Sequence, residues 1–467
     1  MRTAGPRGVP RPRRGAVGRD GTAAVAPPQA LRARGALLGL YGLLGLSVAT
    51  WLSRLPKVRT DLGLSTGEFG TVLLIGSLGS LVTVLVAGGL VARWGSRRSM
   101  MVAAFAFAVA SVFLGLGPTL GSVPVLLVGV VLMSMSFALG NVPLNLESVI
   151  IERAMGRTVV PQFHAAFSVG SVLGSGIGAL AAWGHLPLVV HFSVIGAISL
   201  VWRWHSVPIS VLPVVTPQPV ALAAGRGRRG GAARQAMAAW REPRTLLLGL
   251  VVMAGALSEG TANGWLAISV VDGFAQTEAL AAVVFGVFVA SMTVSRIAGT
   301  AVIDRYGRWP VLMTSSSLAL GGLVLFGLAP SFPLAVAGVV AWGLGSGLVI
   351  PIAMAVVAGD GLGAAGRVSV VSAFASVSGL AAPPVIGIAA EQMGIRHAVL
   401  LIAVVLVLGI LVTRAQRAVF TAASATLPQR TLPQPTLPRP SEEVPAVSSG
   451  HVVACSATDC QIAQEIA

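Results

Sequence analysis

Glu259 is the residue of this sequence with the clearest potential for chemistry inside a membrane. It stands near the middle of "VVMAGALSEGTANGW", Val251 to Trp265, within an apolar run long enough to cross a bilayer. An ionised carboxylate in hydrocarbon costs about 3 kcal/mol or more, so such a residue faces a water-filled path or a partner. Burial disfavours the charged form of a carboxyl group. We therefore predict proton coupling or substrate contact by Glu259, with a structural ion pair to Arg296 as the alternative.

Other polar residues recur at helical spacing inside apolar runs. Asn263 follows Glu259 by four residues, Asn141 and Asn145 are four apart, and His164 begins a line of serines. This spacing places the members of each set on one helix face, which is costly if it meets lipid. We predict that these faces line a substrate or proton pathway. Close helix packing, with each Ser hydrogen-bonded to its own backbone, is the alternative; it is favoured for the serine and glycine positions and stays open for Asn141, Asn145 and His164.

Composition identifies the class of protein. The chain has 467 residues, of which 55% are hydrophobic and 10% charged, and its mean hydropathy is +0.84. Apolar runs of roughly 17–25 residues are typical of transmembrane helices. The sequence predicts an all-α membrane protein with twelve transmembrane helices, at about 35–53, 69–92, 100–116, 122–146, 161–183, 187–203, 245–268, 279–303, 310–329, 332–356, 366–388 and 395–413.

The formal net charge of +16 is spread over alternate loops. A nucleic-acid binder gathers its basic residues on one folded face, so nucleic acid is not an expected partner. The positive-inside rule places both termini and the 204–244 loop in the cytoplasm. Arg54, Lys57 and Arg59, after the first run, are an exception to this pattern, as is Arg396.

These features divide the chain into five segments. We expect a disordered basic tail at 1–34, a six-helix bundle at 35–203, a linker at 204–244, a second bundle at 245–415 and a disordered Pro-rich tail at 416–467. Cys455 and Cys460 both fall in the last segment and are interpreted as free thiols. No metal site and no cofactor are predicted.

A half-length repeat supports this division. "GGLVARWGSRR", Gly88 to Arg98, matches "GTAVIDRYGRW", Gly299 to Trp309, at a shift of 212 residues. "GSVLGSGIG" and "GLAAPPVIG" match at a shift of 209. Six helices occurring twice indicate two six-helix pseudo-repeats related by an axis along the membrane normal.

With this repeat, residues 35–415 resemble the major facilitator superfamily. Four stretches are similar to its L-fucose permease-like branch: "WLSRLPKVRTDLGLS", "GNVPLNLESVIIERAMGRTVVPQFHAAFSVGS", "SEGTANGW" and "GLAAPPVIG". Relatives in this branch often carry acids where this chain has Asn141 and Gly264. If those acids carry protons, this protein has one such group or works as a facilitator.

The resemblance implies that the two repeated loops gate the cytoplasmic side. We call them the signature loops, and their predicted gating residues are Gly88, Arg93, Gly95, Arg97, Asp304, Arg305, Gly307 and Arg308. The first copy departs from the family pattern, because Ala92 stands where an acid is expected. The alternative is that the basic residues of that copy serve only as signals that set the membrane topology.

The resulting prediction is a monomeric secondary transporter of the plasma membrane, working by alternating access between two bundles. The resemblance implies a small polar organic solute, such as a sugar, carried in proton symport. A drug or metabolite exporter is one alternative, disfavoured because "GSVLGSGIG" lacks the proline of many exporters. A membrane sensor that binds without transport is another. An enzyme is not expected, and no nucleotide-binding loop of the GxxxxGK[ST] type occurs.

Overall fold

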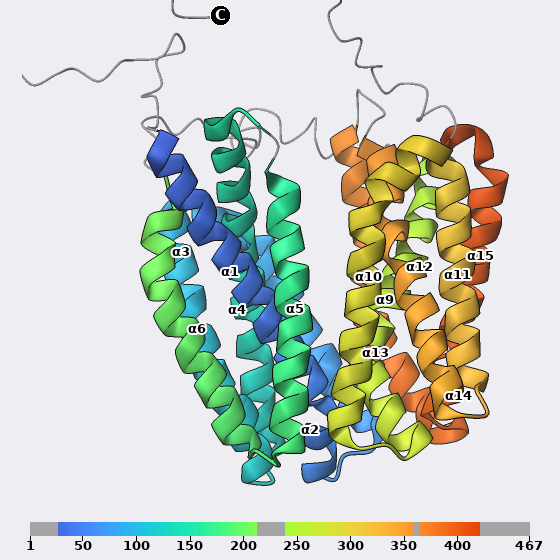
Figure 1. Ribbon diagram of the computed structural model, residues 1–467, viewed down its shortest axis with the longest axis horizontal. Coiled ribbons are helices and arrows are strands. Elements are labelled where there is room, and N and C mark those ends of the chain that lie inside the picture. The colour runs from blue at the N-terminus through green and yellow to red at the C-terminus, as the bar shows by residue number, and fades with distance from the viewer. Residues whose placement is uncertain (1–26, 158, 213–238, 359–363, 421–467) are drawn as a thin grey trace, which may run out of the picture. The chain divides into compact units, whose positions relative to one another are not determined.

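The computed structural model describes residues 27–157, 159–212, 239–358 and 364–420. All of these lie in the first of two compact units, residues 1–425. Within them every regular element is a helix, and the helices form two bundles (Figure 1). The amino-terminal bundle contains α1 (Pro27–Ser53), α2 (Leu55–Asp61), α3 (Thr66–Thr119), α4 (Val123–Met155), α5 (Val160–Trp183) and α6 (Leu188–Ser210).

The carboxyl-terminal bundle repeats this arrangement. It contains α9 (Pro243–Phe274), α10 (Glu278–Tyr306), α11 (Arg308–Leu328), α12 (Phe332–Ala358), α13 (Ala364–Met393), α14 (Ile395–Ala398) and α15 (Leu401–Ala415). Eleven helical segments of the described chain are long and apolar enough to cross a membrane, with α14 and α15 counted as one. The 54 residues of α3 contain two of the predicted runs, separated at Gly95, so the prediction of twelve spans is confirmed.

The helices differ from the predicted runs mainly at their ends. α1 begins at Pro27 and so includes residues 27–34, which the sequence placed in the tail. Ala, Leu and Arg favour helix, and Arg34 is held by Gln162, whose side-chain oxygen accepts its Nε–H at 3.0 Å. α6 likewise continues to Ser210, and the short helix α2 has no apolar run to predict it. Residues 213–238 of the linker and 421–467 of the tail lie outside the described residues.

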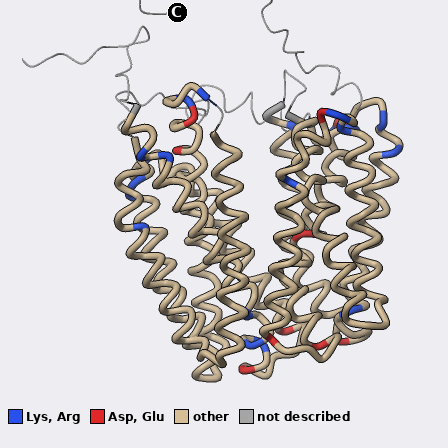
Figure 2. Tube along the Cα trace, viewed as in Figure 1, with Lys and Arg blue, Asp and Glu red and all other residues tan. Residues whose placement is uncertain are grey.

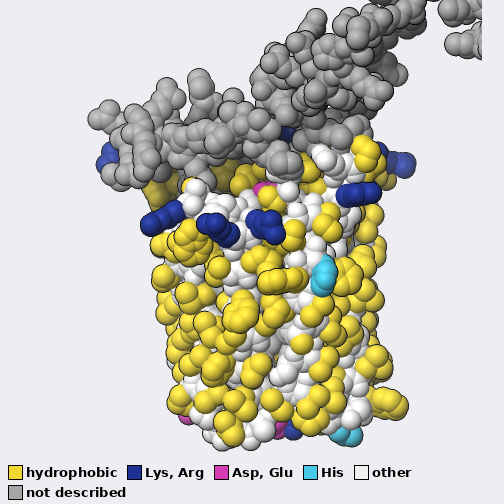
Figure 3. Space-filling view, turned by 90° about the vertical axis from the view of Figure 1, so that its left-hand side faces the viewer, with side chains coloured by type: hydrophobic (Ala, Val, Ile, Leu, Met, Phe, Trp, Pro, Cys, Tyr) yellow, Lys and Arg dark blue, Asp and Glu magenta, His cyan; other side chains and the backbone are white. Residues whose placement is uncertain are grey.

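The surface of the bundles is apolar between two charged ends. Large side chains such as Leu85, Leu180 and Val404 are mostly exposed. Figure 3 shows this hydrophobic face on the amino-terminal bundle, with a row of Lys and Arg near the end away from α2. Most charged residues gather at the two ends of the helices, as Figure 2 shows. Such a belt is the surface expected against lipid hydrocarbon.

The two repeats are visible in the backbone as well as the sequence. Gly95 has φ 79° and ψ 161°, and Gly307 has φ 83° and ψ 164°. Positive φ is a region that glycine enters at little cost, which explains a glycine at both equivalent turns. The contacts between the bundles obey the same symmetry. α5 packs on α10, and α3 packs on α13, and the repeat relates one pair to the other.

Candidate functional site

An ion pair lies inside the carboxyl-terminal bundle at the predicted position. Glu259, on α9, accepts a hydrogen bond through Oε2 from Nη2 of Arg296, on α10, at 3.0 Å. Nε–H of Arg296 also donates to the carbonyl oxygen of Gly347, on α12, at 3.2 Å. Both charged side chains are half-buried. The carboxylate therefore has the partner that the sequence offered as its structural alternative, and the pair remains accessible to solvent.

A second polar group lies on the amino-terminal bundle. Nδ2 of Asn145 donates to Oδ1 of Asn141 at 2.6 Å, and Oη of Tyr41 donates to Oδ1 of Asn145 at 3.1 Å. The Tyr41 ring meets His164 edge to face, with ring centroids 5.7 Å apart, and stacks on Phe163. Three predicted residues are thus brought together by Tyr41, a residue that sequence reasoning missed.

The α5–α10 interface brings the two polar groups toward each other. Arg296 lies close enough to His164 for the guanidinium charge to act on the imidazole. A methyl group on Gly286 of α10 would lie 3.1 Å from Cβ of Ser175 on α5, so small residues allow the close approach. Asn263 is half-buried one turn from Glu259. We call Glu259, Arg296, Asn263, Tyr41, Asn141, Asn145 and His164 the central polar site.

Buried hydrogen bonds hold α9 against α12 beside Glu259. Nε1 of Trp342 donates to Oγ of Ser258 at 2.7 Å, and the hydroxyls of Ser258 and Ser346 are 3.0 Å apart. Trp342 and Ser258 are fully buried. Such a satisfied network fixes the rotation of α9, which determines where Glu259 points. This hydrogen-bond network could not be predicted from the sequence, because Ser258, Trp342 and Ser346 each fit the pattern of an ordinary apolar helix face.

Ion pairs join the two bundles at the end of the molecule that contains α2, which we call the α2 end. Arg54 is 1% exposed, and its Nε lies 2.7 Å from Oε1 of Glu278 on α10. Arg59 of α2 pairs with Asp272 of α9. Two of the basic residues that departed from the loop-charge pattern, Arg54 and Arg59, are therefore neutralised by acids of the other bundle, whereas Lys57 pairs with Asp61 of its own helix.

A third polar contact and apolar packing close the same end. The backbone N–H of Gly67, on α3, donates to Oε1 of Glu391, on α13, at 3.0 Å. Trp265 is fully buried and meets Phe69 of the other bundle edge to face, with centroids 6.4 Å apart. The contacts Arg54–Glu278, Arg59–Asp272 and Gly67–Glu391, which join the two bundles, lie together at the α2 end. The bundles are thus latched at one end.

The signature loops lie at the other end of the helices. Arg93, Gly95, Arg97, Asp304 and Arg305 are exposed, and Gly88, Gly307 and Arg308 are half-buried. The Arg305 guanidinium lies 5.4 Å from the centre of the Tyr306 ring. At the end of α4, Oε2 of Glu152 accepts the backbone N–H groups of Val159 and Val160, at 2.8 and 2.9 Å, and so caps the start of α5.

One deep carboxylate was missed. The sequence marks Glu259 as the carboxylate deep within a span, yet Glu147 of α4 is 2% exposed and therefore more buried. It interacts with Ser96, just beyond Gly95, and with the backbone of Leu212. The predicted run ended at residue 146, whereas α4 continues to Met155, which explains the omission.

Comparisons with known proteins agree with this architecture. The family model described as Major Facilitator Superfamily matches residues 2–151 and 162–369. The uncharacterized transporter y4wD of Sinorhizobium fredii is 30% identical over 371 residues, covering 78% of this chain and 92% of that protein. A mutant form of the nucleoside transporter NupG has a TM-score of 0.67 at 15% identity, covering 83% of this chain and all of that one. A mutant form of the E. coli fucose:proton symporter FucP has a TM-score of 0.53 at 14% identity, covering 84% and 99%.

Proposed function

The chain belongs to the major facilitator superfamily of membrane transporters, and from this premise we propose that it moves a small polar organic solute by alternating access with proton coupling. The observation that carries the proposal is the Glu259–Arg296 ion pair, which lies within a central polar site drawn from both bundles. Amide, hydroxyl and imidazole groups can donate and accept hydrogen bonds. A hydroxyl-rich solute such as a sugar suits this set.

The ion pair supplies a mechanism for coupling. A proton on Glu259 removes the carboxylate charge, which weakens its hold on the Arg296 guanidinium. The guanidinium is then able to turn toward the solute or toward the amino-terminal bundle. Because His164 lies within reach of the same charge, protonation of Glu259 alters the electrostatics between the bundles. A single proton thereby biases the equilibrium between two arrangements of the bundles.

The latch at the α2 end supports a proposal for the state of the transport cycle. We place the α2 end outside the cell and both termini in the cytoplasm of a plasma-membrane protein, which is supported by exposed Arg93, Arg97 and Arg98 at the signature-loop end. In this orientation the external side is shut. Opening it requires the Arg54–Glu278 and Arg59–Asp272 pairs to break as the bundles rock about the central polar site.

Counterflow in proteoliposomes tests the proposal. Vesicles preloaded with an unlabelled sugar or other polar solute should accumulate the labelled form transiently, because a transporter exchanges one for the other. A pH gradient, acid outside, should then drive net uptake of the same solute. Solutes that bind without any exchange would show a sensor rather than a transporter. Export driven by the opposite gradient would favour an exporter.

The signature loops are proposed to close the cytoplasmic side in the alternate state, and Gly307 offers a sharp test. Gly307 has φ 83° and ψ 164°, a backbone region that essentially only glycine adopts, so leucine there costs about 1–3 kcal/mol. We expect Gly307→Leu to reduce the transport rate at least tenfold with normal membrane expression, measured as initial uptake. Gly321→Leu is the matched control, since nothing lies within 4 Å of its Cβ position. Wild-type uptake by Gly307→Leu would rule out a gating role for this turn.

A further inference from the structure

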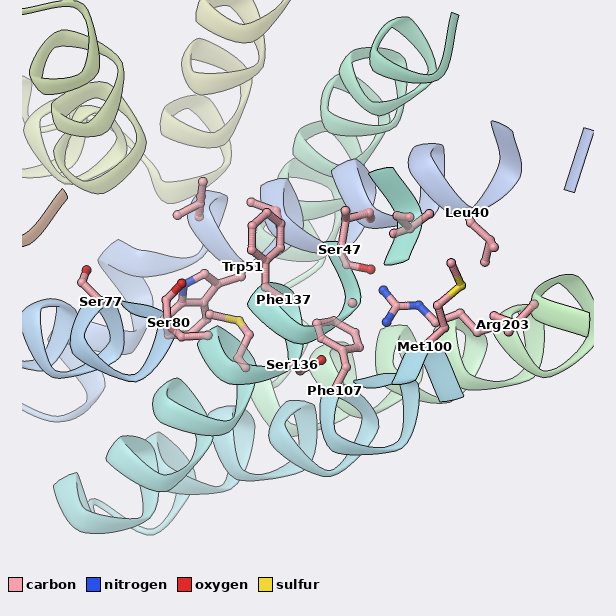
Figure 4. Close-up of a pocket in the computed structure, with 18 residues that line it drawn as sticks. Leu40, Ser47, Trp51, Ser77, Ser80, Met100, Phe107, Ser136, Phe137 and Arg203 are labelled. Carbon is pink, nitrogen blue, oxygen red and sulfur yellow. The ribbon is translucent and has the colours of Figure 1, made fainter. Parts of the chain in front are cut away.

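A cavity of about 290 Å³ lies inside the amino-terminal bundle, between α1, α3, α4 and α6. Figure 4 shows its walls, which carry the rings of Trp51, Phe107 and Phe137 and the hydroxyls of Ser47 and Ser136. None of its lining residues belongs to the central polar site. The cavity is large enough to hold a small organic molecule rather than water alone.

Arg203 of α6 is the charged residue of this cavity. It is 8% exposed, and Figure 4 shows its guanidinium directed into the space between Ser47 and Phe107. Within the described part of the chain it makes no hydrogen bond or ion pair, and its recorded contact is the Phe107 ring, 5.2 Å from the guanidinium carbon. A guanidinium has five N–H donors, and a buried cation without a partner is costly. The buried guanidinium of Arg203 is therefore expected to bind an anion.

The hydroxyl groups next to Arg203 do not supply the missing negative charge. Ser47 donates to the carbonyl oxygen of Leu43 at 2.8 Å, and Ser136 donates to that of Ala103 at 2.7 Å. Each hydroxyl oxygen keeps lone pairs but no negative charge. Among the described residues, no Asp or Glu lines the cavity. The cavity therefore combines one unpaired positive charge with aromatic walls.

We propose that this cavity is a binding site for a small organic anion, whose carboxylate pairs with Arg203 and whose apolar body packs against Trp51 and Phe137. Arg suits a carboxylate because its planar fork donates two parallel hydrogen bonds. The aromatic walls exclude water, which strengthens that pairing. The site is distinct from the Glu259–Arg296 pair, so it stands or falls independently of the transport cycle proposed above.

Thermal unfolding of the full-length protein in neutral detergent tests the site. The probes are benzoate, phenylacetate and indole-3-acetate, each compared with its uncharged amide of nearly the same shape. A ligand that binds the folded state raises Tm with concentration. We expect at least one carboxylate to raise Tm by several degrees at saturation, and its amide to have a much smaller effect.

Variants then assign the effect to Arg203. Arg203→Gln should abolish the carboxylate response. Arg203→Lys should keep the response with at least tenfold weaker affinity, because lysine retains the positive charge but lacks the planar guanidinium that donates two parallel hydrogen bonds to a carboxylate. Arg414→Gln, at an exposed position outside the cavity, controls for loss of one positive charge and should respond as wild type. Without ligand, Arg203→Gln should unfold no earlier than wild type, since it removes an unpaired buried charge.

Several results would overturn the proposal. These are equal responses to acid and amide, an undiminished response in Arg203→Gln, and no response to any of the three carboxylates. A Tm rise produced by phosphatidylglycerol but by none of the carboxylates would show a lipid headgroup site instead. Failure of counterflow with a carboxylate that binds through Arg203 would leave the site intact and count against its being a transported solute.

Discussion

Replacing Glu259 by Gln is expected to abolish accumulation of the solute against a gradient while exchange continues. Glutamine keeps the size of the side chain and an oxygen that can accept from Arg296, but it does not titrate. The proton step is therefore lost, whereas the two bundles can still rock with solute bound. We expect the ratio of internal to external solute to fall to about one. Counterflow should stay within roughly tenfold of wild type, since a neutral hydrogen bond is weaker than a charged one by about that much.

Glu68→Gln is the matched control for this experiment. Glu68 is an exposed carboxylate that caps the start of α3, accepting the backbone N–H of Ser65 at 2.9 Å, and Gln retains that acceptor. It should accumulate solute as wild type does. Loss of solute binding in Glu259→Gln, without exchange, would make Glu259 a substrate ligand. Unchanged accumulation and unchanged affinity would reduce Glu259 to a structural partner of Arg296.

Several features of the fold and of the central polar site could be predicted from the sequence. The cost of a charge in hydrocarbon singles out Glu259, and helical spacing places Asn141 and Asn145 on one face, where they do hydrogen-bond. The twelve spans follow from apolar runs, and the two turns at Gly95 and Gly307 follow from the repeat. These features are local in the chain or repeated along it, so composition and periodicity can detect them.

Contacts between distant segments could not be predicted. Arg54 and Glu278 are separated by more than 200 residues, and their pairing depends on how the two bundles pack. Arg203 lies at the end of an apolar run, where a basic residue ordinarily marks the membrane surface, and only the packing of α6 shows that it is buried. Likewise, nothing in the sequence pattern around Tyr41 indicates that it contacts Asn145 and His164. The partners of these residues are determined by tertiary packing, which a single sequence does not specify.

Loss of the Arg54–Glu278 pair is expected to open the α2 end. With Arg54 only 1% exposed, Glu278→Gln leaves a buried cation without its counter-ion, and breaking a buried pair costs about 3–5 kcal/mol. The cost applies to the closed arrangement, in which the two groups meet, and is relieved when the bundles part and water reaches Arg54. Since 1.4 kcal/mol is a factor of ten, even half the penalty shifts the equilibrium toward the open state about tenfold.

Reaction of a cysteine at the closed interface measures that shift. Leu73 is half-buried on α3, and its Cδ1 lies 3.7 Å from the Cβ position of Gly264 on α9. In a Leu73→Cys protein with Cys455 and Cys460 replaced by Ser, Glu278→Gln should speed labelling by a membrane-impermeant maleimide, added outside intact cells, at least tenfold. Asp61→Asn is the control. Asp61 pairs with Lys57 at 2.5 Å, and because both residues lie on α2, this ion pair does not connect the two bundles. Equal labelling rates in Glu278→Gln and the control would show that this pair is no latch, and labelling only from the cytoplasmic side would reverse the orientation proposed for the α2 end.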